Sequence, residues 1–174
     1  PTSLPQGAIT QEIPVGAIAR LAGEFPAQNW MDYGDAHKGV AILNRGLPGN
    51  NVEGGVMLLS LLKATALKEG YGESGGFSKS TKTTDGYELG VRHEFDYALV
   101  PHPGDWRQAK VSRRGLEFNR PLLGLKATKH PGRLPQRFSL IEVSGESLAV
   151  SAVRDTPQGT VVRVYETEGR AQAG

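Results

Sequence analysis

The stretch that most constrains the fold is residues 90–106, GVRHEFDYALVPHPGDW, in which side chains alternate between two faces. Successive side chains of an extended chain point to opposite sides. One side would carry Val91, His93, Phe95, Tyr97 and Leu99, and the other Arg92, Glu94 and Asp96. Pro101, Pro103 and Gly104 follow and are expected to end the strand. The pattern predicts a β-strand and contains no complete catalytic apparatus.

The composition favours a fold of many short strands. Glycine (23 residues) and proline (11 residues) lie between apolar runs, as expected where turns join strands. Hydrophobic residues make up 38% and charged residues 22%, which indicates a folded, soluble chain. The 20 basic and 18 acidic residues are interspersed, so we expect no nucleic-acid partner. We predict an all-β protein, a large antiparallel β-sandwich with one short helix.

Several absences narrow the class of protein further. The sequence has no cysteine, so it can form neither a disulfide framework nor a thiolate metal site. No apolar run approaches the roughly 20 residues that span a bilayer, and no N-terminal signal pattern occurs. We therefore expect no membrane partner and a cytoplasmic location. The chain begins at Pro1 without an initiator methionine and ends in a polar tail, which suggests a fragment of a longer polypeptide.

The first half of the chain is expected to contain short strands. Residues 1–11 are rich in turn formers and predict an irregular connection, followed by a short strand within 13–21 and an extended segment at 24–33. Residues 39–44 and 54–64 are apolar and are expected to pair across the turn-rich segment 45–53. For 54–64 the periodicity alone does not separate a buried strand from a buried helix. Residues 65–87 predict a long surface loop, whose length suggests a role at an interface.

The second half contains the predicted helix. Residues 104–116 favour a helix, with Asp105 as its N-terminal cap and Gly115 near its end. Residues 119–135 contain three prolines and predict a linker that crosses between layers. Three strands are expected at 137–143, 147–153 and 160–166.

Two carboxylates could form a catalytic pair. Glu94 and Asp96 share one face of the predicted strand, roughly 6.5–7 Å apart, which is within the separation found in inverting glycosidases. Beside Arg92 they would also fit a solvated face, and no hydrophobic neighbour is visible that would raise one pKa. The structural interpretation is favoured.

Other polar residues admit a functional and a structural interpretation. Asp32, Asp35 and His37 could bind a metal ion, or could form a surface turn. His102 and Asp105 could form a histidine–carboxylate dyad, but without a neighbouring nucleophile this dyad has nothing to activate. A histidine that fixes a turn is the favoured alternative.

Four aromatic residues could stack against sugar rings, although packing in the core or at an edge is the commoner role of such residues. They are Trp30, Tyr33, Tyr71 and Trp106, of which Tyr71 is expected to be the most exposed.

Five segments, in order, resemble the C-terminal region of the family 38 glycoside hydrolases, the class II α-mannosidases. They are NWMDYGDAHKGVAILN (29–44), VMLLSLLKA (56–64), RHEFDYALVPHPGDW (92–106), EFNRPL (117–122) and VVRVYETEG (161–169). Each segment is weakly specific, but the combination, with its order and approximate spacing, is specific. Two features depart from the family: Lys63 stands where bacterial-type members have arginine, and the link at 65–90 is longer.

The resemblance implies a galactose-mutarotase-like β-sandwich that packs on an N-terminal catalytic barrel. In the family, that barrel holds the zinc ion, the nucleophile and the acid/base residue. None of those motifs matches a position here, so no catalytic or metal-binding residue is carried over. The substrate-binding candidates are Lys63 and Tyr71. We expect residues 1–122 to form part of the large sandwich, 123–135 a linker, and 136–174 further strands, which could open a second small sandwich.

The function implied by the resemblance is therefore that of a non-catalytic portion of an α-mannosidase. The full enzyme would remove terminal α-mannosides from oligosaccharides, so the implied partners are the catalytic barrel and mannose-containing oligosaccharides. One alternative is an autonomous carbohydrate-binding module. Another is a mutarotase-like sugar epimerase that uses His102 and a carboxylate.

Overall fold

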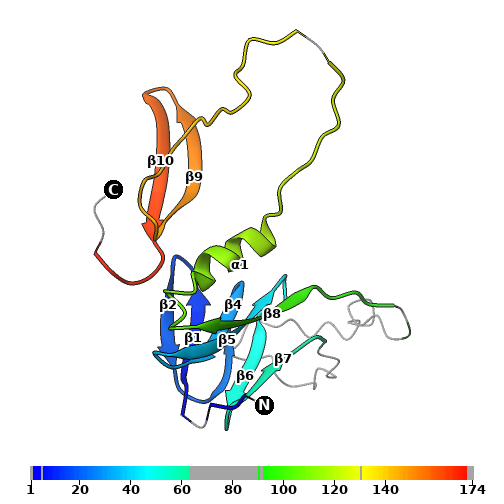
Figure 1. Cartoon of the computed structure of the whole chain (residues 1–174), viewed down its shortest axis with the longest axis vertical. Helices are drawn as coiled ribbons and strands as arrows, with labels where there is room; N and C mark the ends of the chain where they lie inside the picture. Colours follow the sequence, from blue (N-terminus) through cyan, green and yellow to red (C-terminus); the bar gives the residue numbers. More distant parts are fainter. Residues whose placement is uncertain (1, 5, 63–89, 91, 130, 172–174) are drawn as a thin grey trace, which may run out of the picture.

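The computed structural model describes residues 2–4, 6–62, 90, 92–129 and 131–171. Two antiparallel sheets face each other, a helix covers the outer face of the larger sheet, and a two-stranded hairpin follows a long extended segment (Figure 1). Over the residues that the structure describes, this architecture confirms the predicted all-β class with one helix. Among the described residues, no helix has the length and apolarity needed to span a membrane.

The larger sheet has five antiparallel strands in the order β2-β1-β4-β5-β8. They are β1 (Ala8–Ile13), β2 (Gly16–Arg20), β4 (Trp30–Gly34), β5 (Lys38–Asn44) and β8 (Tyr97–Pro103). Strand β4 is buried along its whole length. The two faces of this sheet therefore pack against different layers.

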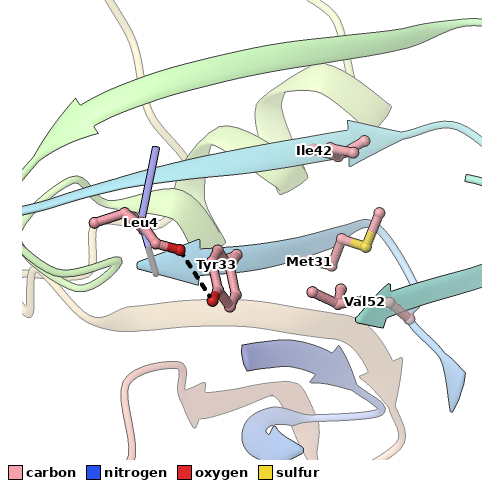
Figure 2. Packing of buried hydrophobic residues seen from close by; sticks show 6 residues of the cluster. Leu4, Met31, Tyr33, Ile42 and Val52 are labelled. Atoms are coloured by element: carbon pink, nitrogen blue, oxygen red, sulfur yellow. Dashed lines mark hydrogen bonds between the residues drawn. The ribbon is translucent and has the colours of Figure 1, made fainter. Parts of the chain in front are cut away.

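The smaller sheet contains β3 (Gly23–Pro26), β6 (Gly49–Glu53) and β7 (Val56–Leu59), in the order β3-β6-β7. It packs on the larger sheet through a cluster that includes Met31, Tyr33 and Ile42 from one sheet and Val52 from the other (Figure 2). The Tyr33 hydroxyl donates a hydrogen bond to the Leu4 carbonyl (3.3 Å). This cluster is the core of the sandwich.

The opposite face of the larger sheet is covered by a turn at 106–110 and by α1 (Val111–Asn119). Trp30 and Trp106 pack with ring centroids 5.2 Å apart, in a second buried cluster that includes Leu43 and Val111. Gly115 lies against Trp30, where an added Cβ would be 2.7 Å from the indole Cδ1. A glycine in mid-helix thus lets the helix approach the sheet closely.

The remaining chain extends away from the sandwich before it pairs with itself. Residues 121–146 contain no helix or strand among their described residues. Strands β9 (Leu148–Thr156) and β10 (Gly159–Glu166) then form an antiparallel hairpin (Figure 1). The predictions for 147–153 and 160–166 are confirmed by this hairpin, and that for 39–44 by β5.

Several predictions for the first half were wrong. Strand β1 begins at Ala8, inside the segment expected to be irregular. The extended segment 24–33 divides into β3 and β4, which belong to different sheets. Strand β6 lies within the supposed turn 45–53 and pairs with β7, whereas β5 pairs with β4 and β8. The prediction missed β6 because Asn50 and Asn51 are typical turn residues. In the structure the Asn50 side chain is buried and accepts a hydrogen bond from Gln11.

In the second half, the ends of three elements differ from prediction. Strand β8 continues through Pro101 to Pro103, because it is an edge strand. The Asp96 carbonyl and the Gly104 N–H bond toward β5, so the odd-numbered positions, where both prolines lie, face the free edge. The helix begins at Val111 instead of near 104, and Gly115 lies inside it. Residues 137–143 form no strand.

Candidate functional site

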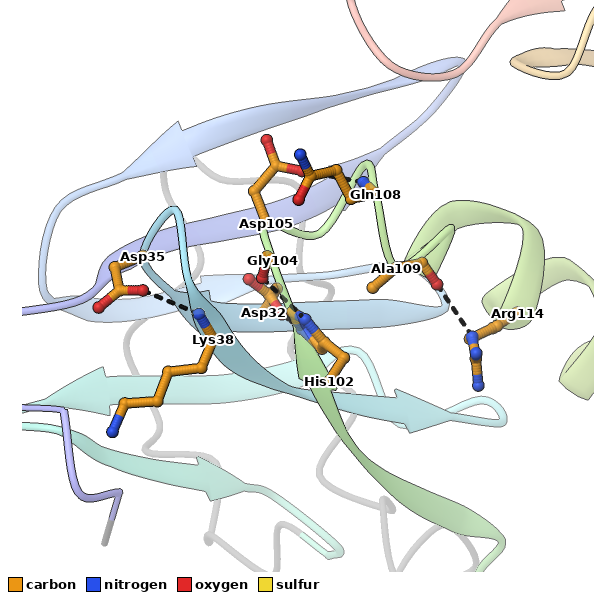
Figure 3. Close-up of polar contacts among 9 residues, drawn as sticks. All are labelled: Asp32, Asp35, Lys38, His102, Gly104, Asp105, Gln108, Ala109 and Arg114. Carbon is orange, nitrogen blue, oxygen red and sulfur yellow. Dashed lines mark hydrogen bonds and ion pairs between the residues drawn. The ribbon is translucent and has the colours of Figure 1, made fainter.

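The most distinctive polar arrangement is a buried histidine–aspartate pair between two strands of the larger sheet. His102 Nε2 on β8 lies 2.7 Å from Asp32 Oδ1 on β4, and both side chains are only 3% exposed. The two residues are 70 positions apart in the sequence and meet across β5 (Figure 3). The pair therefore links β4 to β8 through side chains that cross the intervening strand β5.

The contact depends on a glycine in the intervening strand. Gly39 is the register partner of both His102 and Gly34. A Cβ on Gly39 would lie 2.6 Å from His102 Cε1 and 2.9 Å from Nε2, closer than real carbon contacts allow. Only glycine at this position leaves room for the imidazole to reach Asp32.

Both ring nitrogens of His102 face oxygen atoms. Nδ1 lies 3.2 Å from the Gly104 carbonyl oxygen, which can only accept a hydrogen bond. We therefore place a proton on Nδ1, and one further proton is shared between Nε2 and the Asp32 carboxyl group. This arrangement fixes the ring, and with it the sharp turn at Gly104, whose φ is +67°.

The surroundings of Asp32 favour its protonated form. Burial raises the pKa of Asp32 to about 6, while the hydrogen bond from His102 and the charge of that residue act in the opposite direction. A perturbed pKa is often a feature of catalytic groups. Here, however, the two side chains are only 3% exposed and are bonded to each other, so the geometry supports a structural role.

The alternative dyad of His102 with Asp105 does not form, because Asp105 points elsewhere, and the contact of His102 with Gly104 agrees with the favoured interpretation of a histidine that fixes a turn. Its Oδ1 accepts a hydrogen bond from the Gln108 N–H (2.9 Å), and its carbonyl accepts one from Ala109 N–H (3.0 Å). Asp105 thus caps the turn that precedes the helix, as Figure 3 shows. The sequence signal for the true pair was a glycine at 39, which becomes informative only once the strand register is known.

The metal-ligand candidates do not converge. Asp32 is committed to His102, and Asp35 Oδ1 accepts hydrogen bonds from the N–H groups of His37 (2.7 Å) and Lys38 (2.9 Å). These two bonds lower the pKa of Asp35, as expected for an exposed turn-forming carboxylate. No set of three or more His, Asp or Glu side chains suited to a metal ion occurs in the described parts of the chain. These residues do not fit a zinc ion.

The two carboxylates that share one face of the predicted strand are each bound to an arginine. Glu94 contacts Arg92 (2.5 Å) and Asp96 contacts Arg45 (2.8 Å), and all four side chains are substantially exposed. The ion pairs match the structural interpretation of these acids.

Three of the four aromatic candidates lie in the core. Trp30, Tyr33 and Trp106 are buried, so their faces are not available for stacking on a sugar. Tyr71 and Lys63, the substrate-binding candidates, lie outside the described residues.

A shallow apolar groove of about 770 Å³ runs between the two sheets along β5 and β8. Its lining includes Val40, Met57, Leu99 and Pro101, with His102 at its border. Leu99 is 63% exposed there, because the three strands of the smaller sheet leave the outer part of β8 uncovered. The groove has the apolar character of an incompletely covered sandwich interior.

Most of the segments that carry the family resemblance meet one another in the fold. The Asn44 carbonyl at the end of β5 accepts a hydrogen bond from Asn119 Nδ2 (2.8 Å), which joins 29–44 to 117–122. Arg45 binds Asp96 and the Phe118 carbonyl, and its guanidinium lies over the Phe118 ring (4.8 Å). These contacts fasten the helix and β8 to β5.

The last motif attaches the hairpin. The Glu166 carboxylate accepts hydrogen bonds from the N–H groups of residues 168–170 (2.9, 2.5 and 3.0 Å). Burial opposes its ionisation, but hydrogen bonds from Ser147 and these N–H groups leave the pKa of Glu166 below its usual value. The folded loop presents the Glu168 carbonyl to Arg107 Nε (2.8 Å). The motif is thus a connector between the hairpin and the helix layer.

Comparison with known proteins identifies α-mannosidases as relatives. The chain is 32% identical over 152 residues to α-mannosidase 2C1 from Homo sapiens and 31% identical to that from Mus musculus, covering 84% of this chain and 13% of each relative. It is 27% identical over 156 residues to α-mannosidase G from Dictyostelium discoideum, covering 85% of this chain and 12% of that protein. The chain therefore spans only a small part of the relatives that it matches.

The fold has a counterpart among solved structures. A glycosyl hydrolase family 38 protein from Enterococcus faecalis superposes with a TM-score of 0.77 and 18% sequence identity, covering 96% of this chain and 20% of that protein. No protein-family model matches the chain. Sequence and fold together confirm the resemblance that the motifs indicate: the chain is a homologue of one part of the family 38 glycoside hydrolases, the α-mannosidases.

Proposed function

We propose that this chain is the non-catalytic β-sandwich portion of an α-mannosidase, whose catalytic residues lie elsewhere in a longer polypeptide. The chain would support a catalytic barrel that removes terminal mannose from oligosaccharides, and the zinc ion of such an enzyme would be bound by that barrel. The observation that carries this proposal is the match of 84% of this chain to only 13% of the length of the α-mannosidase 2C1 relatives.

The use of the polar residues supports this assignment. Asp32, Asp35, Asp96 and Glu166 each stabilise a strand pair, a turn or a connector. Such contacts build a rigid scaffold, which a neighbouring active site requires for accurate positioning.

The groove along β8 supports a packing role. Leu99 and its apolar neighbours leave a surface that a further layer of the sandwich or the barrel would cover. Burial of one leucine side chain contributes about 2 kcal/mol, so this surface would add substantially to the stability of the longer polypeptide.

Hydrolysis of 4-nitrophenyl α-mannoside in the presence of zinc tests the proposal. We expect no hydrolysis by the 174-residue chain and normal hydrolysis by the longer polypeptide that contains it. In that polypeptide, Leu99→Glu should lower the melting temperature and the yield of active enzyme. Leu21→Glu is the matched control, because Leu21 is 84% exposed between β2 and β3. Hydrolysis by the chain alone, or equal effects of the two substitutions, would contradict the proposal.

A further inference from the structure

We propose that residues 120–141, here called the arm, dock as an extended strap on an acidic and partly apolar surface of the same α-mannosidase polypeptide, outside the present chain. This inference rests on the proposed function and adds to it the place and the chemistry of one contact. Its basis is the exposure, the charge and the anchoring of the arm.

The arm exposes large apolar side chains to an unusual degree. Leu122, Leu123 and Leu125 are 101%, 98% and 93% exposed, and Leu134, Phe138 and Leu140 are also exposed. Single exposed leucines are common, but several in one short segment mark a contact surface.

The arm is also the basic part of this chain. Residues 118–141 contain five basic residues and no acidic residue. The rest of the chain contains 15 basic and 18 acidic residues. The basic residues Lys126 and Lys129 closely follow the leucines, so the complementary surface has carboxylates beside an apolar depression.

The arm is held at both ends, which reduces the entropy lost on docking. On one side, Asn119 Nδ2 donates to the Asn44 carbonyl (2.8 Å). On the other side, Lys110 forms an ion pair with Glu146. Between these anchors, Pro121, Pro131 and Pro135 remove N–H donors and disfavour a helix. The arm therefore suits a groove that accepts an extended chain, and not a membrane surface that binds an amphipathic helix.

The body of this chain is not the docking surface. The rest of the described chain is tethered to the arm at high effective concentration, yet the arm leucines remain exposed. A second copy of this chain would present the same surface outside the arm, so it is not the expected partner either. The match covers only 13% of the length of the α-mannosidase 2C1 relatives. A longer polypeptide of that size would therefore supply much additional surface on which the arm could dock.

Limited proteolysis with trypsin tests the inference, because the arm offers cleavage sites after Lys126, Lys129, Arg133 and Arg137. We expect cleavage of the arm in the 174-residue chain and at least tenfold slower cleavage at the same sites in the longer polypeptide. Raising the salt concentration from 0.05 to 0.5 M should partly restore cleavage, since exposed charge pairs are screened. Equal cleavage rates in the two proteins would overturn the proposal.

Variants of the longer polypeptide separate docking from general stability. Leu122→Ser with Leu123→Ser, or Lys126→Glu with Lys129→Glu, should increase cleavage at Arg133 and Arg137 several-fold. Leu21→Ser is the control and should not. Because trypsin reports on the arm and mannoside hydrolysis on the chemistry, a non-catalytic chain with an unprotected arm would refute this inference alone.

Two further outcomes would point to another occupant. Protection that increases with the concentration of the 174-residue chain would assign the arm to a second copy. Protection of that chain by phosphatidylserine vesicles would assign it to a lipid surface. Either result would replace the surface proposed here.

Discussion

At the scale of single residues, His102 and Asp32 show how one glycine decides a buried contact. The imidazole crosses β5 at Gly39, and its two nitrogens contact Asp32 and the Gly104 carbonyl. A buried pair of this kind contributes less to stability than its short distance suggests, because desolvation offsets the attraction. Filling the space that the imidazole occupies over Gly39 nevertheless destabilises the fold, because a displaced His102 would no longer form its hydrogen bond with Asp32.

We predict that Gly39→Ala destabilises the chain by about 2–4 kcal/mol. The added Cβ would lie 2.6 Å from His102 and would push the ring away from Asp32. Urea unfolding followed by circular dichroism measures the effect. Gly16→Ala is the matched control, because a Cβ at that strand glycine meets nothing within 4 Å. Similar unfolding midpoints for both variants would contradict the steric argument.

The raised pKa of Asp32 predicts a pH-dependent stability. With a pKa of about 6 in the folded state and a lower one when unfolded, the folded chain binds this proton more tightly. The stability from this group is therefore fully present below pH ~4 and is lost as the pH rises through about 6. A difference of about two pH units corresponds to roughly 3 kcal/mol.

Asp32→Asn should remove this dependence. The unfolding free energies of the variant and the unchanged chain, measured between pH 4 and 7.5, should therefore diverge in favour of the variant as the pH rises. Asp35→Asn is the control: hydrogen bonds lower the pKa of Asp35, so its contribution changes only below about pH 4 and the curve of this variant should stay parallel to that of the unchanged chain between pH 4 and 7.5. Parallel curves for Asp32→Asn and the unchanged chain would rule out the proposed titration.

At the scale of elements, helix α1 shows that close packing can outweigh the low helix propensity of a glycine. Glycine in mid-helix costs about 1 kcal/mol relative to alanine, yet Gly115 lies within α1. The reason is the contact with Trp30, which leaves no room for a Cβ. The sequence pattern alone predicts this glycine near the helix end, because the position of Trp30 beneath it depends on the tertiary fold.

Gly115→Ala should therefore destabilise the chain by about 1–3 kcal/mol, despite the better helix propensity of alanine. The new Cβ would lie 2.7 Å from Trp30 Cδ1 and 3.6 Å from Asn29 Cβ. Tryptophan fluorescence should change as well, since Trp30 packs on Trp106 at 5.2 Å. Gly124→Ala, at a position where a Cβ meets nothing within 4 Å, should have neither effect. Stabilisation by Gly115→Ala would show that propensity outweighs the clash.

Strands composed mainly of aliphatic and β-branched residues can be predicted from the local sequence. Strands that depend on contacts with residues far away in the sequence cannot. Strands β5 and β10 are rich in β-branched or aliphatic residues and were recognised. Strand β6 was missed, because Asn50 is buried beside Gln11, a partner 39 residues away. The continuation of β8 through two prolines could not be foreseen either, since its place at the sheet edge follows only from topology.

The candidate site shows the same limit. Asp32 and His102 were both singled out, but neither was assigned to the other. Their pairing depends on the register of β4, β5 and β8, which no local pattern encodes. The interpretation of Glu94 and Asp96 as structural acids needed only the nearby arginine and agrees with their ion pairs.

At the scale of the whole molecule, the hairpin β9–β10 is attached through a few polar contacts at its base. Ser112 Oγ contacts the Thr167 carbonyl (3.4 Å), Arg107 contacts the Glu168 carbonyl (2.8 Å), and Lys110 pairs with Glu146. An isolated two-stranded hairpin is marginally stable in water. Its order therefore depends on the connector at residues 166–170, which Glu166 folds into shape.

Glu166→Gln should loosen this connector without unfolding the sandwich. The variant replaces a carboxylate that accepts three backbone hydrogen bonds with an amide, and such charge-assisted bonds are stronger than neutral ones. We expect amide exchange in residues 148–170 to accelerate about five- to tenfold, equivalent to about 1 kcal/mol, while exchange in β4 and β5 stays unchanged. Glu142→Gln, which alters an exposed carboxylate in the preceding segment, should leave both regions as they are. If exchange in β4 accelerated equally, the hairpin and the sandwich would form one cooperative unit, and the connector would stabilise the entire chain.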